Sequence, residues 1–318
     1  MFLTIITPFF NNLEHVKNCI RSLEQQDCKD FELILINDSS TEIESTDLDL
    51  LKQNSKILIK LINNEKNLGP GYSRNQGIQI ASSDYLLFLD SDDWLDNQTV
   101  SILKETVGQH KYDCVVFDYY LVKDKLHPSF SVLIKKPQGT MTKKEALLYT
   151  TGSVCCKVYK TELLQKYNVT FPEIYIKEDM VFNKKALCHC KTIFYLKRNL
   201  YYYKIWQNSL MHSEKVFDVT NDIQAFIEIE KALQTYPSVV EALFAKELLY
   251  AGTLNLLCSG TKLDDVKKFL LFWTQKYPNW QNNRYIKELP IRMKVFLWGI
   301  IHNNWPLLRS MAFLKKII

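Results

Sequence analysis

The first 120 residues or so alternate between short apolar runs and segments with helical spacing, and this alternation limits the possible folds more than any other feature. Leu13, Val16, Ile20 and Leu23, for example, recur at the spacing of an amphipathic helix. Alternating strands and helices are typical of an α/β layer fold. We expect strands at 3–7, 31–37, 57–62, 85–89 and 113–119, and helices at 13–26, 72–81 and about 98–107.

The pattern changes in the rest of the chain. Residues 121–139 mix Pro and Gly with lysines, so we expect a connector there. Helices are expected at 142–149, 160–167 and 178–190. Beyond about Phe217 the sequence is helical throughout, with breaks at its prolines and at Gly260. We predict an α/β domain over 1–215, followed by a helical domain over 216–318.

The charge of the chain is concentrated at its end. From Gln281 onward there are seven basic residues and a single acidic residue, a net charge of +6, whereas the whole chain carries +5. Basic residues among Phe and Trp on short helices are typical of a surface that lies in a membrane interface. A core-packing cap or a self-association surface explains them equally well. Nucleic-acid binding is not expected, because no recognised module accompanies the charge.

Several features favour a cytoplasmic protein, placed at the inner face of the cell membrane if the basic tail binds lipid. No apolar run approaches the ~20 residues needed to span a bilayer. The apolar run at 2–10 has no basic stretch before it, as a signal peptide would. The eight cysteines include no C-x-x-C pair and fit free thiols.

Polar residues of interest follow the predicted strands where those strands end. Thr7-Pro8 closes the first strand, Asp38 follows the second, and Asp90-Ser91-Asp92 follows a later one. In open α/β sheets, ligands bind outside the carboxyl ends of the strands. We therefore expect these residues to meet in space.

Asp90 and Asp92 stand one residue apart after a strand, where both carboxylates can face one divalent ion. Oxygen ligands suit a hard cation such as Mg²⁺ or Mn²⁺, which in turn neutralises a diphosphate. Asp-x-Asp turns are also common at strand ends without any metal. The motif alone leaves both interpretations open.

The segment from Asn67 to Gly77 reads N-L-G-P-G-Y-S-R-N-Q-G and combines a glycine-rich turn with the start of a helix. Such a helix N-terminus favours anions, and Arg74 could bind a phosphate with two parallel hydrogen bonds or stay solvated. The glycine spacing does not fit G-x-G-x-x-G, which disfavours a dehydrogenase-type site.

Three acidic residues have both a chemical and a structural interpretation. Asp38 could accept a hydrogen bond from a base N–H, or could cap the turn before Thr41. Glu178 and Asp179 begin a predicted helix, where acids are favoured in any case. The same environment would keep Asp179 ionised, as a general base must be.

Together these segments resemble family 2 of the glycosyltransferases, an inverting group with the GT-A fold, in which helices flank a Rossmann-like mixed sheet. The resemblance spans about 210 residues. It rests on Thr7-Pro8-Phe9-Phe10-Asn11, Asn37-Asp38-Ser39-Ser40, the 67–77 segment, Leu89-Asp90-Ser91-Asp92-Asp93-Trp94, Glu178-Asp179-Met180-Val181-Phe182 and the Tyr201–Ser209 segment.

The resemblance implies a GT-A catalytic domain over 1–215, with a nucleotide-binding part (1–120) and an acceptor-binding part (121–215). It implies Asp179 as general base, Glu178 beside it on the acceptor, and Asp92 as the direct metal ligand, with Asp90 near ribose and metal. Thr7 and Asp38 would hold the base, expected to be uracil. The implied donor-binding set is completed by Pro8, Phe9, Asn11, Asn67, Gly69, Arg74, Asn75, Ser91, Lys204 and Ser209.

His212 has two interpretations: it could reach the metal from the far side, or it could be a solvated histidine. Two residues depart from the family pattern. Ser73 replaces the usual Ala, and Lys177 stands before Glu178 where Gly is common, which would alter how that loop meets the acceptor. A near match to the Q-x-x-R-W segment of processive members begins at Gln281, in the wrong region, so we expect transfer of single sugars.

The function expected from the resemblance is metal-dependent transfer of a sugar from a UDP-sugar to a glycan or lipid-linked acceptor of a bacterial surface polysaccharide. A sugar nucleotidyltransferase is a rival with a related fold, but it would have a first loop rich in Gly and Arg, unlike Phe9-Phe10-Asn11-Asn12. A non-catalytic glycan-binding or scaffold subunit is a second rival. Intact Asp90, Asp92 and Asp179 argue against it.

Overall fold

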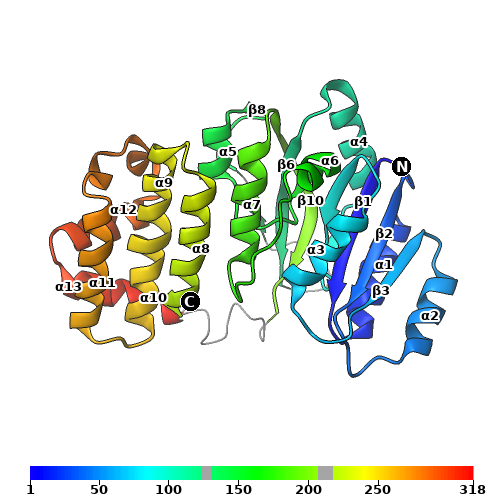
Figure 1. Cartoon of the computed structure of the whole chain (residues 1–318), viewed down its shortest axis with the longest axis horizontal. Helices are drawn as coiled ribbons and strands as arrows, with labels where there is room; N and C mark the ends of the chain where they lie inside the picture. The colour runs from blue at the N-terminus through cyan, green and yellow to red at the C-terminus, as the bar shows by residue number, and fades with distance from the viewer. Residues whose placement is uncertain (124–129, 133, 207–217, 318) are drawn as a thin grey trace. The chain divides into compact units, whose positions relative to one another are not determined.

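The computed structural model describes residues 1–123, 130–132, 134–206 and 218–317 (Figure 1). These residues form two compact units. The first contains 1–173 and 178–206, and the second contains 174–177 with the described residues beyond 206. The predicted domain boundary near residue 215 lies outside the described residues and stays a prediction. The assignment of 174–177 to the second unit was not expected from the sequence.

The first unit is built on a mixed β-sheet. Its strands are β1 (Leu3–Phe9), β2 (Phe31–Asn37), β3 (Ile59–Asn63), β4 (Tyr85–Phe88), β5 (Trp94–Leu95), β6 (Cys114–Val122), β7 (Phe130–Val132), β8 (Gly139–Met141), β9 (Lys157–Lys160) and β10 (Ile193–Lys204). The order along the sheet is β3-β2-β1-β4-β9-β6-β10-β5, with β7 on β6 and β8 on β10. The predicted α/β architecture with a mixed sheet is confirmed.

The strands that carry the predicted nucleotide-binding motifs are parallel. β3, β2, β1 and β4 all run in one direction, with Phe9 opposite Asn37 and Ile6 opposite Phe88. Every residue of β1 and β2 is buried, as expected for central strands covered on both faces. Because their carboxyl ends align, the residues that follow these strands share one edge of the sheet.

Helices complete the first unit: α1 (Leu13–Glu24), α2 (Ser45–Asn54), α3 (Pro70–Ile80), α4 (Thr99–His110), α5 (Lys143–Tyr149), α6 (Thr161–Lys166) and α7 (Glu178–His189). Helix α3 lies across β1 and β2 (Figure 1). It begins at Pro70, two residues before the predicted start, because proline suits the first helical position. Gly77 allows the close approach, since a Cβ there would lie 2.7 Å from the Ile6 side chain.

Two predictions in the second half of this unit need correction. The expected connector at 121–139 contains the end of β6, strand β7 on β6 and the start of β8. Strands β9 and β10 were not predicted, although β10 pairs with β6, β5 and β8. The register of β10 shifts twice, around Asn199, which breaks the alternation of buried and exposed residues that would indicate a strand.

The described residues of the second unit beyond 217 are mainly helical, as predicted. Its helices are α8 (Val219–Ala232), α9 (Pro237–Phe244), the π-helical segment η3 (Ala245–Gly252), α10 (Thr253–Cys258), α11 (Leu263–Lys276), the short helices η4 (Trp280–Asn282) and η5 (Arg284–Glu288), α12 (Ile291–Ile301) and α13 (Trp305–Ile317). Within the described ranges, no helix combines the length and apolar character required to cross a bilayer.

Candidate active site

The ends of β1, β2 and β4 are joined by backbone hydrogen bonds. The Asp38 N–H donates to the Phe9 carbonyl at 2.8 Å, and the Leu89 N–H donates to the Ile6 carbonyl at 3.0 Å. Asp90 follows directly on Leu89. The residues that follow these strands therefore lie at one edge of the sheet, and their meeting in one donor site stays a prediction.

Asn11 connects the loop after β1 to the loop after β2. Its backbone N–H donates to Ser40 Oγ at 2.7 Å, and its Oδ1 accepts from the N–H groups of Thr41 and Glu42 at 2.9 and 3.2 Å. Before it, Thr7, Pro8 and Phe9 are buried. The Thr7 side chain interacts with the buried thiol of Cys19. Asn11 thus shapes the loops, and Thr7 lies beneath them.

Asp38 holds the glycine turn that precedes α3. Its Oδ2 accepts from the Gly69 N–H at 2.7 Å, and its Oδ1 accepts from the Leu68 N–H at 3.1 Å and the Asn64 amide at 2.8 Å. Gly69 has a φ of +86°, which glycine adopts readily. The alternative in which Asp38 caps the turn before Thr41 is wrong, because Asn37 Oδ1 accepts from the Ser40 N–H there. Contact between Asp38 and a base stays a prediction.

Asn67 and Asn75, both predicted for donor binding, differ in exposure and in hydrogen-bond partners. Asn67 is exposed on the turn. The Asn75 side chain instead pairs with the backbone of Phe171, accepting from its N–H at 2.8 Å and donating to its carbonyl at 3.0 Å. The Phe171 ring stacks on Phe182 at a centroid separation of 4.0 Å. Asn75 therefore fixes an aromatic platform.

Arg74 lies on that platform and joins the two acidic motifs. It is 4% exposed, and its guanidinium carbon is 5.3 Å from the centre of the Phe171 ring. Nη2 donates to Asp90 Oδ1 at 2.6 Å, and Nη1 donates to Asp179 Oδ1 at 2.8 Å. Glu178 Oε1 lies 3.8 Å from Nη1. The alternative of a solvated Arg74 is therefore wrong, because its side chain is buried against carboxylates. Its contact with the donor stays a prediction.

The carboxylates of Asp90 and Asp92 repel each other. Burial, and then the charge of Asp90, raises the pKa of Asp92 to about 6. A hard cation held between the two would relieve this repulsion, and their oxygen atoms are the ligands that Mg²⁺ and Mn²⁺ prefer. Ser91, between them, is half-buried. The described residues contain no group of three or more His, Cys, Asp or Glu side chains placed to bind a metal. Asp90 and Asp92 thus fit an ion whose remaining ligands are not His, Cys, Asp or Glu side chains of the described residues.

Asp93 and Tyr201 are site residues to which the sequence assigned no role. The Tyr201 hydroxyl donates to the Asp93 carboxylate and accepts from the Asp90 N–H at 3.3 Å. Asp93 also accepts from the Lys204 N–H at 2.7 Å. These contacts tie the turn after β4 to β10. Two sequence features could have indicated these residues: Asp93 is the second acid of the Asp92-Asp93 pair, and Tyr201 is the first tyrosine of the Tyr201–Tyr203 run.

Lys204, predicted to lie near the donor diphosphate, donates from Nζ to the Lys123 carbonyl at 2.7 Å. Its ammonium also lies over the Trp206 ring. Ser209 and His212 lie outside the described residues, so their predicted roles in donor and metal binding stay predictions.

Glu178 and Asp179 form the first turn of α7. Burial and repulsion from Asp179 raise the pKa of Glu178 to about 7, against the attraction of Arg74. Burial also raises the pKa of Asp179, again opposed by Arg74 and reinforced by Asp90. The role of Asp179 as an ionised general base stays a prediction. Among the charged groups around Asp179, the cation of Arg74 favours its ionised form.

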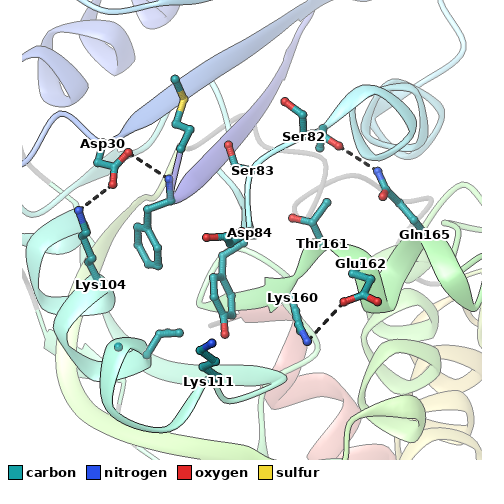
Figure 2. A pocket seen from close by; sticks show the side chains of 16 residues that line it. Asp30, Ser82, Ser83, Asp84, Lys104, Lys111, Lys160, Thr161, Glu162 and Gln165 are labelled. Atoms are coloured by element: carbon teal, nitrogen blue, oxygen red, sulfur yellow. Dashed lines mark hydrogen bonds and ion pairs between the residues drawn. The ribbon is translucent and has the colours of Figure 1, made fainter.

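A separate cavity of about 610 Å³ opens at the other end of the strands, beside Phe2 and Tyr85 (Figure 2). Its lining includes two ion pairs, Lys104 with Asp30 at 2.7 Å and Lys160 with Glu162 at 3.5 Å. None of the residues that the sequence assigned to a site lines it. We therefore place the candidate active site at the carboxyl edge of the sheet.

Solved structures share the fold over the whole chain. The Staphylococcus aureus TarS fragment 1–349 in complex with UDP-GlcNAc has a TM-score of 0.70 at 23% identity, covering 100% of this chain and 88% of that one. The mannosyltransferase PcManGT from Pyrobaculum calidifontis, in complex with GDP-Man and Mn²⁺, has a TM-score of 0.55 at 13% identity, covering 99% and 86%. These likenesses show that the chain has a GT-A fold.

The sequence comparisons are more specific. The model of "Glycosyl transferase family 2" matches residues 4–167, more than half of the chain. The chain belongs to glycosyltransferase family 2. The matched range includes Arg74, Asp90 and Asp92 but ends before Glu178 and Asp179.

Curated relatives include the glycosyltransferase GlyA of Streptococcus pneumoniae, which is 25% identical over 225 residues, 65% of this chain and 31% of that protein. The poly(ribitol-phosphate) beta-N-acetylglucosaminyltransferase TarS of S. aureus is 28% identical over 207 residues, 64% and 35%. The putative glycosyltransferase EpsH of Bacillus subtilis is 24% identical over 249 residues, 73% and 71%. The chain thus spans about a third of the length of the first two relatives.

Proposed function

We propose that this chain is an inverting, metal-dependent glycosyltransferase that transfers single sugars from a UDP-sugar to a glycan or glycolipid acceptor. The observation that carries the proposal is the position of Arg74, hydrogen-bonded to both Asp90 and Asp179. One guanidinium group is small, so the carboxylate expected near the donor and the carboxylate expected to act as base lie within one site. A displacement reaction requires that proximity.

In the proposed step, the oxygen of an acceptor hydroxyl forms a bond to the anomeric carbon as the bond from that carbon to the diphosphate breaks. The electron pair of the broken bond leaves with UDP, and the hydroxyl proton passes to Asp179. Burial favours the protonated form of Asp179, and the charge of Arg74 opposes this by favouring the ionised form. The hydrogen bond from Arg74 also orients the carboxylate. Glu178, in the same helical turn, is placed to bind the acceptor.

Asp90 and Asp92 are the residues that would hold a divalent cation, which when bound neutralises negative charge on the departing diphosphate. Tyr201 and Asp93 fix the turn that carries this pair. Asp38 and Asn11 order the loops in which the nucleotide base is expected to bind. Each of these contacts forms the site before substrate arrives, so less ordering is required on binding.

The similar proteins suggest which donor and acceptor to test first. TarS is named for N-acetylglucosamine transfer to poly(ribitol phosphate), and a fragment of it was solved with UDP-GlcNAc. Another relative, from Borreliella burgdorferi, is named a cholesterol galactosyltransferase. UDP-GlcNAc and UDP-galactose are therefore the first donors to test, with polyol-phosphate, oligosaccharide and glycolipid acceptors.

The test is UDP release from a panel of UDP-sugars, with and without Mn²⁺ or Mg²⁺. We expect slow hydrolysis of at least one donor, dependence on the metal, and loss of activity in Asp92→Asn. Asp49→Asn, an exposed aspartate of α2, is the matched control and should leave the rate unchanged. Donor binding without UDP release, under every metal and acceptor tested, would support the non-catalytic rival.

We also propose that the basic tail binds an anionic membrane surface through α12. Ile291 is 72% exposed and Trp298 is 49% exposed, with Val295 exposed between them. These residues share one helical face. Arg292 is exposed beside them, and the tail from residue 281 has a net charge of +6. Exposed apolar side chains among basic ones fit anionic lipid better than a neutral partner.

Vesicle sedimentation tests this surface without deleting the buried residues of the tail. Ile291→Ser/Trp298→Ser and Arg292→Glu should each reduce binding to vesicles that contain phosphatidylglycerol, and the unchanged protein should not bind vesicles of phosphatidylcholine alone. Leu50→Ser, at an exposed apolar position of α2, is the control. Concentration-dependent dimerisation that the double substitution abolishes, with no vesicle binding, would show instead that the face contacts a second copy of the chain.

A further inference from the structure

Lys157, the first residue of β9, has a fully buried side chain in the first unit. Its Nζ donates to the carbonyl oxygens of Thr151 at 3.0 Å and Ser153 at 2.7 Å. Both acceptors lie in the segment 151–155, between α5 and β9, which we call the 151–155 loop. Burying an ammonium group is costly unless hydrogen bonds replace its contacts with water. The donors of Lys157 therefore fix the shape of this loop.

The 151–155 loop is also bound to α7, the helix whose first turn carries Asp179. The Asn183 amide of α7 donates to the Thr151 carbonyl at 2.6 Å and to the Gly152 carbonyl at 3.5 Å. Asn183 is completely buried and follows Asp179 by four positions, so the two side chains lie on one face of the helix. The Thr151 carbonyl thus accepts from Lys157 and Asn183 together, which ties the loop to α7.

Two residues of the loop meet acidic side chains of the candidate active site, all within the first unit. The Cys155 thiol, on a side chain that is 3% exposed, donates to Asp90 Oδ2 at 3.5 Å. The backbone N–H of Val154 interacts with the Asp179 carboxylate and favours its ionised form. The charge of Lys157 favours the same form. The loop is therefore a second link between Asp90 and Asp179, in addition to the bridging arginine.

We propose that Lys157 is a positioning residue: its ammonium fixes the 151–155 loop so that Val154 and Cys155 hold Asp179 and Asp90 in the arrangement that the sugar transfer requires. The inference rests on the proposed function for the roles of those two acids. An apolar side chain of similar length would fill the same space but would leave two buried carbonyl groups of the loop with fewer donors. A lysine at this buried position is explained by that role.

The test compares Lys157→Met, which removes the donors, with Lys157→Gln, which keeps a neutral donor group. Lys157→Met should lower kcat for UDP release at least about 10-fold, because a displaced base acts on the transition state more than on donor binding. The KM for the UDP-sugar should change less than about threefold. Lys157→Gln should have a kcat between those of Lys157→Met and the unchanged protein. A rise in KM alone, or an unchanged kcat in both variants, would overturn the proposal.

Lys184→Met is the matched control that separates positioning from stability. Lys184 is a second buried lysine of the same unit, 2% exposed on α7, and its Nζ also donates to a backbone carbonyl. That carbonyl belongs to Leu147 of α5 rather than to the 151–155 loop. Lys184→Met should therefore lower the melting temperature while kcat stays near its original value. Equal losses of kcat in Lys157→Met and Lys184→Met would overturn the proposal, because destabilisation would then explain both.

Alkylation of Cys155 by iodoacetamide, measured by mass spectrometry, tests the loop without catalysis. In the unchanged protein it should be slow, as at Cys19, which is 1% exposed on α1 of the same unit. In Lys157→Met the rate should rise several-fold at Cys155 but not at Cys19, because the loop opens locally. An unchanged rate at Cys155, or a parallel rise at both cysteines, would overturn the positioning role. If Cys155 responds as expected but the unchanged protein releases UDP from no UDP-sugar, the proposed function fails while the control of the loop by Lys157 stands.

Discussion

Arg74 and Asp179 are separated by 105 positions in the sequence, yet their side chains form a hydrogen bond of 2.8 Å. The same guanidinium reaches Asp90, 16 positions away, at 2.6 Å. With only 4% of its surface exposed, Arg74 requires charged partners, because burying an unpaired cation is costly. The two acidic motifs therefore depend on one arginine for their relative position.

Arg74→Lys should abolish most activity although it keeps the charge. A lysine ammonium is a single point donor and cannot reproduce the planar fork that reaches both Asp90 and Asp179. We expect kcat to fall about 100-fold, in line with the loss of a positioned charged partner at a catalytic group. Arg21→Lys, on the exposed face of α1, is the control. The check is steady-state UDP release, and near-normal kcat would show that the bridge is dispensable.

Asn75→Ala decides between two roles for Asn75. Its amide makes two hydrogen bonds to the backbone of Phe171, so a structural role predicts a loss of about 1–3 kcal/mol in the free energy of unfolding. A donor-binding role predicts a higher KM for the UDP-sugar at unchanged stability. We expect the first result, measured by urea denaturation. Gln79→Ala, exposed on the same helix, is the matched control.

Apart from α2 and β5, the sequence was sufficient to predict the elements of the first part of the fold, up to β6. Residues 33–36 of β2 are a continuous apolar run, and α1 has clear helical periodicity, so local patterns indicate both. Strand β10 could not be found in this way, because its two register shifts destroy the alternation and its partners are distant in sequence. Its place in the sheet is fixed by tertiary pairing.

In the candidate site, too, features set by local sequence patterns were predictable and features set by distant contacts were not. The residues at the carboxyl ends of the strands were located correctly because the parallel sheet aligns those ends. The partners of individual polar side chains were not predictable. Asn75 and Asp38 bind backbone groups in segments 96 and about 30 positions away, and nothing in a local motif specifies such distant partners.

Tyr201→Phe tests whether β10 supports the acidic turn. The substitution removes the hydroxyl that donates to Asp93 and accepts from the Asp90 N–H, and it leaves a buried carboxylate with one partner fewer. We expect a stability loss of about 1–3 kcal/mol and weaker activation by Mn²⁺, seen as a several-fold higher metal concentration at half-maximal rate. The neighbouring Tyr202→Phe is the control. An unchanged metal response would separate Tyr201 from the Asp90–Asp92 pair.

Gly77→Ala should destabilise the first unit although alanine favours helices. The added Cβ would lie 2.7–3.0 Å from three atoms of Ile6, on a buried strand with little room to move. Overpacking of this kind costs about 1–3 kcal/mol, more than the roughly 1 kcal/mol gained in helix propensity. Gly108→Ala, on α4 with no atom within 4 Å of the new Cβ, should instead stabilise. Thermal denaturation of both variants provides the comparison, and equal shifts would contradict the close approach of α3 to β1.

Glu178→Gln should remove a pH dependence of stability that the unchanged protein shows. Because the folded-state pKa of Glu178 is raised from 4.5 to about 7, the folded state binds this proton more tightly than the unfolded state. Its contribution to stability is therefore fully present below about pH 4.5 and is lost as the pH rises through about 7. Relative to the unchanged protein, the Gln variant should gain on the order of 1–3 kcal/mol across that window. Urea denaturation at several pH values measures this difference, with Glu173→Gln as the matched control. A difference that stays constant with pH would mean that Glu178 is ionised throughout, held in that form by Arg74.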